Sequence, residues 1–196
     1  MLLFSKAVNA LSKGEVVVYP TDTLYGLGAD IFNDSAVRKV FNLKNRSFND
    51  PLSIAVSGIN EIEKIAFLDD RTRFIAEVFL PGRLTLVLKK KKIVSDIITS
   101  GLDKVAVRIP KNQIALKLLS DFGPLTSTSA NIHGKQTPTV INDIYMQFKD
   151  KVRVYLDDGL LESKPSTILD TTSEEIKVLR AGDISKKEIM EAITNG

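Results

Sequence analysis

The sequence contains no cysteine, and this absence removes several kinds of chemistry. Disulfide bonds, thiolate zinc sites and cysteine nucleophiles are all excluded. Histidine is almost as scarce, because His133 is the only one in the chain. A metal site with several histidines is therefore excluded, and so is a Ser-His-Asp triad unless His133 is its base. In this position His133 is more typical of a surface loop than of a catalyst.

Long hydrophobic runs are also missing. No apolar run approaches the roughly 18 residues that a membrane-spanning helix needs. The longest runs, such as residues 16–19, have the length of a strand. The first ten residues include Lys6 and no long apolar core, so they do not resemble a signal peptide. We therefore expect a cytoplasmic protein without a membrane contact.

The common nucleotide-binding motifs are absent too. After Gly26 and Gly28, Ile31 occupies the position where a dinucleotide fingerprint needs its third glycine. The segment from Gly134 to Thr137 contains a lysine and a threonine but lacks the glycine frame of a P-loop. A nucleotide site in this chain must be built in another way.

The composition is that of an ordinary globular protein. The chain has 196 residues, of which 43% are apolar and 26% are charged, enough for one sizeable core. The net charge of +3 is mildly basic and favours anionic ligands. No linker, repeat or low-complexity tract interrupts the chain. Apolar periodicity and turn residues predict one α/β domain over residues 1–196, built around a twisted, mixed sheet.

The expected elements follow from these patterns. Strands are predicted over residues 16–19, 52–56, 84–88, 105–109, 152–156, 166–169 and 176–179. Helices are predicted over residues 4–11, 61–67, 71–79, 113–119, 140–148 and 184–193, with a further helix capped by Asp34 or Ser35. Residues 21–28 are expected to form a loop, because hydroxyls and glycines dominate them.

Two cations one residue apart, Lys44 and Arg46, follow the helix expected after Asp34. They could complement the negative end of the helix dipole and remain solvated. They could instead bind a polyanion, since arginine offers a planar fork and lysine a point charge. Asp50 could hold either cation in place or bind a ligand hydroxyl. The pattern alone leaves both interpretations open.

A second polar cluster follows the strand-like residue Leu125. Ser127, Ser129 and Asn131 alternate, so they would share one side of an extended segment and could line a pocket. They could equally be turn residues before the next helix. Arg108 lies in an apolar strand, where an arginine usually has a partner or faces a cavity. The lysine run 89–92 favours a solvated strand end, with RNA contact as the alternative.

Seven motifs occur in an order that resembles a known family. They are Pro20-Thr21-Asp22-Thr23-Leu24-Tyr25-Gly26-Leu27-Gly28, Lys44-x-Arg46 with Pro51-Leu52, Pro81-Gly82-x-Leu84-Thr85, Val107-Arg108-Ile109-Pro110, Thr126-Ser127-Thr128-Ser129-Ala130-Asn131 with Gly134, Ser166-Thr167, and Leu179-Arg180-x-Gly182. Together they resemble the YrdC-like threonylcarbamoyl-AMP synthase family over about residues 8–183. Each motif alone is weak, but their order makes the resemblance specific.

The resemblance implies a fold and a reaction. The fold is an open twisted α/β sheet with flanking helices around a large basic cavity. The reaction joins L-threonine, bicarbonate and ATP, with Mg²⁺ accompanying the ATP, to give threonylcarbamoyl-adenylate and pyrophosphate. A tRNA-modifying threonylcarbamoyl transferase complex then uses the adenylate to make N6-threonylcarbamoyladenosine at position 37 of ANN-decoding tRNAs. A weak direct contact with tRNA is a further alternative.

The resemblance also implies roles for individual residues, all carried over by motif. The catalytic set comprises Lys44, Arg46, Ser129 and Asn131. The ATP-binding set comprises Arg46, Asp50, Thr85, Ser129, Thr137 and Arg180. The threonine-binding set comprises Thr23, Arg108, Ser127 and Ser166. No protein residue is assigned to a metal.

Three positions depart from the family pattern. Arg83 and Ser47 stand where many members have proline, and Ala55 stands where longer members can have a threonine-contacting histidine. We expect no counterpart of the additional C-terminal domain that longer members have. Two rival functions remain open: an RNA-binding module that uses the same basic concave surface without catalysis, and a carbamoyl-adenylate activity like that of the module in hydrogenase maturation proteins.

Overall fold

The computed structural model of the chain describes residues 2–195. Its strands form one nine-stranded sheet with the order β7-β1-β2-β6-β3-β5-β4-β8-β9. The strands are β1 (Val17–Tyr19), β2 (Gly26–Gly28), β3 (Ser53–Ala55), β4 (Leu84–Lys89), β5 (Lys104–Arg108), β6 (Leu125–Ser129), β7 (Val154–Tyr155), β8 (Thr167–Asp170) and β9 (Lys177–Arg180).

Helices follow most of these strands along the chain. They are α1 (Leu2–Ser12), α2 (Asp34–Lys44), α3 (Ile59–Ile65), α4 (Asp70–Phe79), α5 (Asp96–Thr99), α6 (Gln113–Phe122), α7 (Ile141–Phe148) and α8 (Lys186–Asn195), with a 3₁₀ turn at Lys149–Lys151. None of the helices within residues 2–195 is long and apolar enough to span a bilayer.

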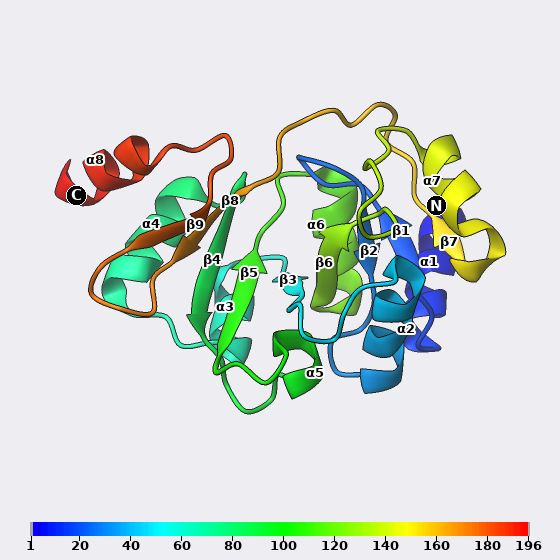
Figure 1. Cartoon of the computed structure of the whole chain (residues 1–196), viewed down its shortest axis with the longest axis horizontal. Helices are drawn as coiled ribbons and strands as arrows, with labels where there is room; N and C mark the ends of the chain where they lie inside the picture. Colours follow the sequence, from blue (N-terminus) through cyan, green and yellow to red (C-terminus); the bar gives the residue numbers. More distant parts are fainter. Residues whose placement is uncertain (1, 196) are drawn as a thin grey trace.

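The sheet is mixed, as the sequence predicts. Strands β1 and β7, β3 and β5, and β4 and β8 pair in parallel, and the other neighbours pair antiparallel. In Figure 1 the early elements α1, α2, β1 and β2 gather at one end of the molecule. The elements α4, β9 and α8 lie at the other end, and the segment between β7 and β8 arches between the two (Figure 1). The α/β architecture with an open mixed sheet is therefore confirmed.

Two apolar clusters sandwich the sheet. Val18 belongs to the larger cluster, while its neighbours Val17 and Tyr19 belong to the smaller one, together with residues of α1 and α6. This split follows from the alternation of side chains along a strand. Both clusters consist of residues with almost no exposed surface, and burial of this kind provides most of the favourable free energy of folding.

Helix α2 ends in a way that positions the cation pair. It is capped by Asn33, whose side chain accepts from the Ala36 amide at 3.1 Å, so the expected cap at Asp34 or Ser35 is wrong by one or two residues. At the other end Asn45 adopts the left-handed conformation, with φ of 50°, as is common after a helix. Because the chain changes direction at Asn45, the side chains of Lys44 and Arg46 lie in different surroundings.

The structure corrects three other expectations. Residues 26–28 form strand β2 and are not part of a loop. The hydroxyl cluster lies within strand β6 and not after it. The short helix α5 was not expected; it forms where Ser95 accepts from the Ile97 amide at 3.3 Å, a side-chain cap that begins a helix.

Candidate active site

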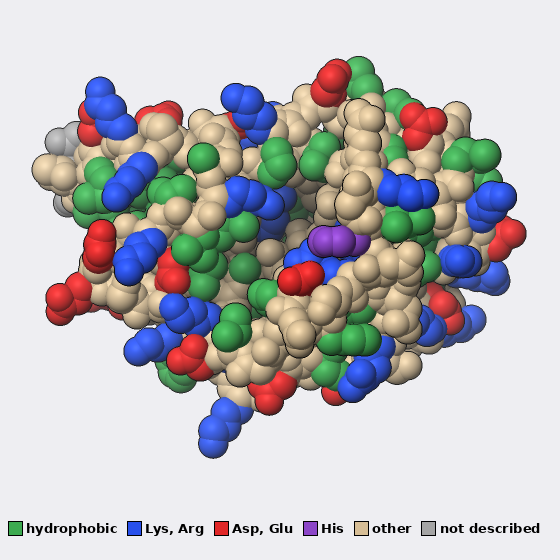
Figure 2. Space-filling view, viewed as in Figure 1, with side chains coloured by type: hydrophobic (Ala, Val, Ile, Leu, Met, Phe, Trp, Pro, Cys, Tyr) green, Lys and Arg blue, Asp and Glu red, His purple; other side chains and the backbone are tan. Residues whose placement is uncertain are grey.

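A cavity of about 270 Å³ opens where β2, β6 and β3 meet the ends of β4 and β8. Small residues face one another across the strands of its wall. Gly26 pairs with Ser129, and Ser127 pairs with Ser53, in the antiparallel registers of β2 with β6 and of β6 with β3. Because these side chains are short, the sheet leaves room beside them. Figure 2 shows the molecule hollowed near the middle of this face, with Lys and Arg side chains close by.

The loop between β1 and β2 forms one side of the cavity. Thr21 organises this loop: its Oγ1 atom donates to the Leu24 carbonyl at 2.6 Å and accepts from the Thr23 and Leu24 amides. The Oγ1 atoms of Thr21 and Thr23 are 3.0 Å apart. The cavity is lined here by Thr21, Thr23 and Leu24. The hydrogen bonds of the Thr21 hydroxyl therefore fix the conformation of this part of the cavity wall.

Arg108 reaches this loop from the end of β5. Its Nη2 atom lies 2.5 Å from Asp22 Oδ1, and its Nη1 atom donates to Thr23 Oγ1 at 3.2 Å. Only 8% of each side chain of the Arg108–Asp22 ion pair is exposed. Arg108 Nε and Asp22 Oδ2 have no hydrogen-bond partner among the described residues. Arg108 also lines the cavity, so its guanidinium lies close to any ligand that binds there.

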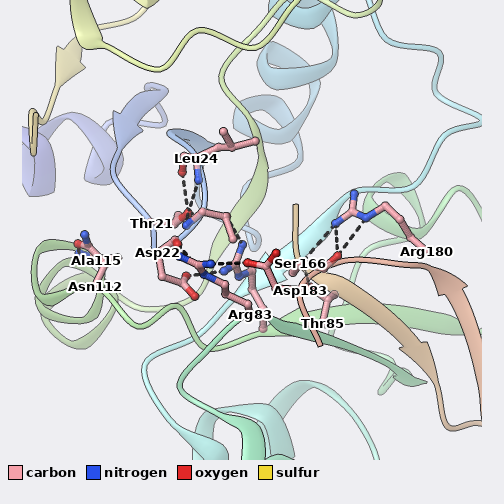
Figure 3. A network of polar contacts seen from close by, with 12 residues as sticks. Thr21, Asp22, Leu24, Arg83, Thr85, Asn112, Ala115, Ser166, Arg180 and Asp183 are labelled. Carbon is pink, nitrogen blue, oxygen red and sulfur yellow. Dashed lines mark hydrogen bonds and ion pairs between the residues drawn. The ribbon is translucent and has the colours of Figure 1, made fainter. Parts of the chain in front are cut away.

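The opposite wall comes from β4, β8 and β9. Thr85 Oγ1 and Ser166 Oγ are 2.7 Å apart and both residues are buried. Arg180 donates from Nε and Nη2 to the Ser166 carbonyl, at 3.1 and 2.8 Å (Figure 3). Burial, followed by the positive charge of Arg108, lowers the pKa of Arg180. Two arginines thus approach the same cavity.

Lys44 lies behind the wall and does not line the cavity. Only 2% of Lys44 is exposed, and its ammonium donates to the Ser129 carbonyl and to the carbonyl and Oδ1 atoms of Asn131. Ser129 Oγ in turn donates to Asn131 Oδ1 at 2.6 Å. Burial, followed by the positive charge of Arg46, lowers the pKa of Lys44 to about 7. Lys44 and Asn131 therefore brace Ser129, which does line the cavity.

Arg46 lies in the cavity wall itself. Its Nε and Nη2 atoms donate to the Asp50 and Pro51 carbonyls at 3.1 and 3.0 Å. Asp50 is thus linked to the site through its backbone, although it is not among the lining residues. Since the bonds of Arg46 within the described chain go to neutral carbonyls, its positive charge remains available to an anion.

The structure gathers nine of the twelve residues predicted for the site around this one cavity. These are Thr23, Arg46, Thr85, Arg108, Ser127, Ser129, Thr137, Ser166 and Arg180. The other three are Lys44, Asn131 and Asp50, which contact lining residues from behind. The placement agrees with a shared site, and the role of each residue stays a prediction.

Several lining residues were not singled out from the sequence. Thr128 and Ile168 line the cavity from strands, and Pro165 lines it from the segment before β8. Tyr25 also holds this part of the chain in place. The single hydrogen of its hydroxyl has two acceptors within reach, Asp157 Oδ1 and the Gly159 carbonyl, and its oxygen accepts from the Asp158 amide. Burial is the largest cause that raises the pKa of Tyr25 to about 12. Because Tyr25 lies within the first of the seven motifs, the sequence did mark it as a residue of the site region.

The contacts of the lysine run 89–92 weaken the argument that these four lysines bind RNA. Lys90 bonds to the Val94 carbonyl and Thr99 Oγ1 and pairs with Asp96. Lys91 donates to the Glu63 carbonyl and lies over the Phe67 ring. Two of the four lysines are therefore used in holding neighbouring loops. The RNA-binding alternative stays a prediction with a weakened basis.

Magnesium has no cage of carboxylates in the described structure. No group of three or more His, Asp or Glu residues within residues 2–195 is arranged to hold a metal ion. The lining residues offer hydroxyls and guanidinium groups but no carboxylate. Mg²⁺ prefers oxygen ligands and commonly remains bound to substrate phosphates, and its involvement here stays a prediction.

The fold and the basic, hydroxyl-lined cavity define an α/β protein with a cavity suited to anionic ligands. In comparisons with known proteins, residues 9–182 match the Sua5/YciO/YrdC family, whose description is "telomere recombination". The chain belongs to this family. A Methanocaldococcus jannaschii relative is 45% identical over 172 residues, which cover 87% of this chain and 81% of the relative.

A relative and a solved structure from Pyrococcus abyssi extend the comparison. The relative, named threonylcarbamoyl-AMP synthase, is 37% identical over 190 residues, covering 95% of this chain. The structure, a crystal structure of Sua5 complexed with L-threonine, superposes with a TM-score of 0.93 at 36% identity over 97% of this chain. The chain spans only 56% of that relative and 57% of the crystallised protein.

Proposed function

We propose that the chain is a threonylcarbamoyl-AMP synthase that joins L-threonine, bicarbonate and Mg-ATP in this cavity. The observation that carries the proposal is the lining: Arg46, Arg108 and Arg180 converge with hydroxyl groups, and no carboxylate is among the lining residues. The one carboxylate paired with these arginines, that of Asp22, contacts Arg108 from outside the lining. Family membership and the name of the Pyrococcus relative support the same activity. Three positive groups suit a substrate set with a triphosphate, a carboxylate and a carbonate.

The chemistry needs no nucleophile from the protein. The threonine amine attacks the carbon of CO₂ or bicarbonate and forms a carbamate, with release of a proton in the case of CO₂ and of water in the case of bicarbonate. A carbamate oxygen then bonds to the α-phosphorus of ATP, and the bond from that phosphorus to the bridging oxygen breaks as pyrophosphate leaves. The protein holds the reactants in line and offsets the growing negative charge. This explains how a chain without cysteine can catalyse the reaction.

The two sides of the cavity receive different parts of the substrates in this proposal. Thr23, Arg108 and Ser127 hold threonine, and the positive guanidinium of Arg108 suits its carboxylate. Arg46, which also lines the cavity, contacts the phosphates of ATP in this proposal. A charge-assisted bond of this kind contributes more than a neutral one. Ser129 completes the nucleotide side, with Lys44 and Asn131 fixing its position.

The product belongs to a longer reaction sequence. The threonylcarbamoyl adenylate is an activated acyl group, so a transferase must accept it and pass the threonylcarbamoyl group to an amine. We propose that this acceptor is the tRNA-modifying threonylcarbamoyl transferase complex that makes N6-threonylcarbamoyladenosine. Mg²⁺ supplies charge neutralisation on the triphosphate when it is bound.

Pyrophosphate release tests the proposed activity. The wild-type chain is incubated with Mg-ATP, bicarbonate and each amino acid in turn, and each component is then omitted singly. We expect release only when threonine and bicarbonate are both present. Arg46→Ala should lower kcat/KM for ATP about ten- to a hundredfold through the lost charge-assisted bonds.

Arg38→Ala is the matched control for Arg46→Ala. Arg38 lies on α2, is exposed and contacts the Phe48 ring outside the cavity. Its replacement should leave turnover close to that of the wild type. Release of pyrophosphate without threonine, or normal turnover in Arg46→Ala, would contradict the proposal.

A further inference from the structure

Arg83 links three segments that are far apart in the sequence. It follows the Pro81-Gly82 turn and leads into β4. Its Nε atom donates to the Asp22 carbonyl at 3.2 Å, and its Nη1 atom forms an ion pair with Asp183. Figure 3 shows the Arg83 side chain between these two aspartates. The loop after β1 is thereby joined to the segment after β9.

The Asp183 end of this link is firmly anchored. The amides on either side of it, those of Gly182 and Ile184, donate to Thr167 Oγ1 at 3.1 and 3.2 Å. Thr167 Oγ1 donates in turn to the Ile184 carbonyl at 2.7 Å. The Thr167 amide also donates to the Arg83 carbonyl at 3.0 Å. Both Arg83 and Asp183 are therefore fixed relative to strand β8.

The Asp22 end of the link leads into the cavity. The carboxylate of Asp22 accepts from Arg108 Nη2 at 2.5 Å, and Arg108 Nη1 donates to Thr23 Oγ1 at 3.2 Å. Whatever sets the position of Asp22 therefore also sets the plane of the Arg108 guanidinium. The side-chain bonds of Thr21 tie the loop to itself, and the Tyr25 hydroxyl ties its end to residues 157–159. None of these bonds reaches β8.

We infer that Arg83 is a positioning residue for the threonine side of the cavity. It holds the Asp22 carbonyl against the β8–β9 wall, and so fixes Arg108 and Thr23 in the geometry that binds threonine. The inference rests on the proposed function, because it takes Arg108 and Thr23 as threonine contacts. It assigns Arg83 an effect on threonine affinity, although Arg83 itself lies outside the lining of the cavity.

The exposure of the ion pair separates this role from a general structural one. The side chains of Arg83 and Asp183 are 43% and 25% exposed. Ion pairs in such positions add little to global stability. Removing the pair should therefore leave the fold intact and change only the placement of the Asp22 loop. A residue that merely stabilised the fold would affect both substrates alike.

Steady-state kinetics on three variants tests the inference, with melting temperature as a check on folding. Arg83→Met should raise the KM for threonine about three- to tenfold, with the KM for ATP unchanged and the melting temperature within about 3 °C of the wild type. Asp183→Asn should have a smaller effect, because the bond from Arg83 to Asp22 remains. The double variant should be no worse than Arg83→Met, since both changes act through one link.

Arg73→Met provides a matched control, because Arg73 forms an ion pair of similar exposure with Glu63, away from the cavity. Its kinetics should match those of the wild type. Arg83→Lys, which can keep one of the two contacts, should fall between Arg83→Met and the wild type. An unchanged threonine KM in Arg83→Met, or an equal rise in the KM for ATP, would overturn the inference.

Calorimetric titration with L-threonine alone separates the inference from the proposed function. If the wild type releases no pyrophosphate but binds threonine, the proposed activity fails while the affinities still decide the role of Arg83. Weaker threonine binding in Arg83→Met than in the wild type then supports the inference. Equal binding, or no threonine binding by the wild type, refutes it.

Discussion

Lys44 illustrates how one residue can belong to a site without facing it. Its ammonium is buried and has three oxygen acceptors, on Ser129 and Asn131. The ammonium group carries three donor hydrogens, so each can be matched to one acceptor. Without the lysine, buried acceptors would be left unsatisfied, at a cost of about 1–3 kcal/mol each. Lys44 therefore stabilises the wall on which Ser129 stands.

Burial also makes the contribution of Lys44 depend on pH. Its pKa falls from 10.5 to about 7 in the folded chain, so between these values the unfolded chain binds more protons. Stability must therefore rise with pH through that window. Urea unfolding of the wild type and Lys44→Met at about pH 6.5 and about pH 9.5 measures this. The wild type should gain stability relative to the variant as pH rises; a constant difference would contradict the lowered pKa.

Most strands and helices could be predicted from apolar runs and from glycine and proline positions. Strand β2 could not, because Gly26 to Gly28 contain only one apolar side chain. This strand forms because β1 pairs with it on one side and β6, which begins almost a hundred residues later, pairs with it on the other. The hydroxyl cluster was misplaced for the same reason: Ser127 to Ser129 extend β6 by pairing with β2 and β3. Pairing between distant segments is not encoded in a local pattern.

The sequence predicts which residues form the candidate site better than it predicts how those residues are arranged in space. The residues that surround the cavity were found because their motifs occur in a recognisable order. The separation of Lys44 from Arg46 was not, since it depends on the left-handed turn at Asn45. Asp22 and Arg83 were overlooked as partners of site residues, because their contacts join segments about sixty or more residues apart.

Gly182 tests how strands β8 and β9 hold their side of the cavity. A Cβ atom on Gly182 would lie 2.4 Å from the Pro165 carbonyl and 2.5 Å from the Thr167 amide, both backbone atoms that cannot easily move aside. Gly182→Ala should therefore cost about 1–3 kcal/mol in the free energy of unfolding. It should also weaken ATP binding, because Arg180, which is predicted to bind ATP, lies two residues before Gly182.

Gly58→Ala is the control for this substitution. No atom lies within 4 Å of a Cβ built on Gly58, and its backbone is extended, with φ of −171°. The change should cost less than about 1 kcal/mol, the difference between these residues at a helix N-cap. Urea unfolding measures both variants. Equal stability of the two would show that the segment after β9 is not held tightly against residues 165–167.

At the scale of the whole molecule, the cavity joins segments from both ends of the sheet. The β1–β2 loop and β6 come from one side, and Thr85, Ser166 and Arg180 come from the other. The chain's modest net charge of +3 understates the local effect, because three arginines are concentrated at one cavity. We propose that this assembly joins threonine, carbonate and adenylate in one product.

Double labelling of the nucleotide product tests that claim most directly. The wild-type chain is incubated with Mg-ATP, radiolabelled bicarbonate and threonine with a different label, and the nucleotides are separated by chromatography. Both labels should appear in equal amounts in one new adenylate, and Arg46→Ala should greatly reduce it. An adenylate that contains threonine without the bicarbonate carbon, or no labelled nucleotide at all, would contradict the account.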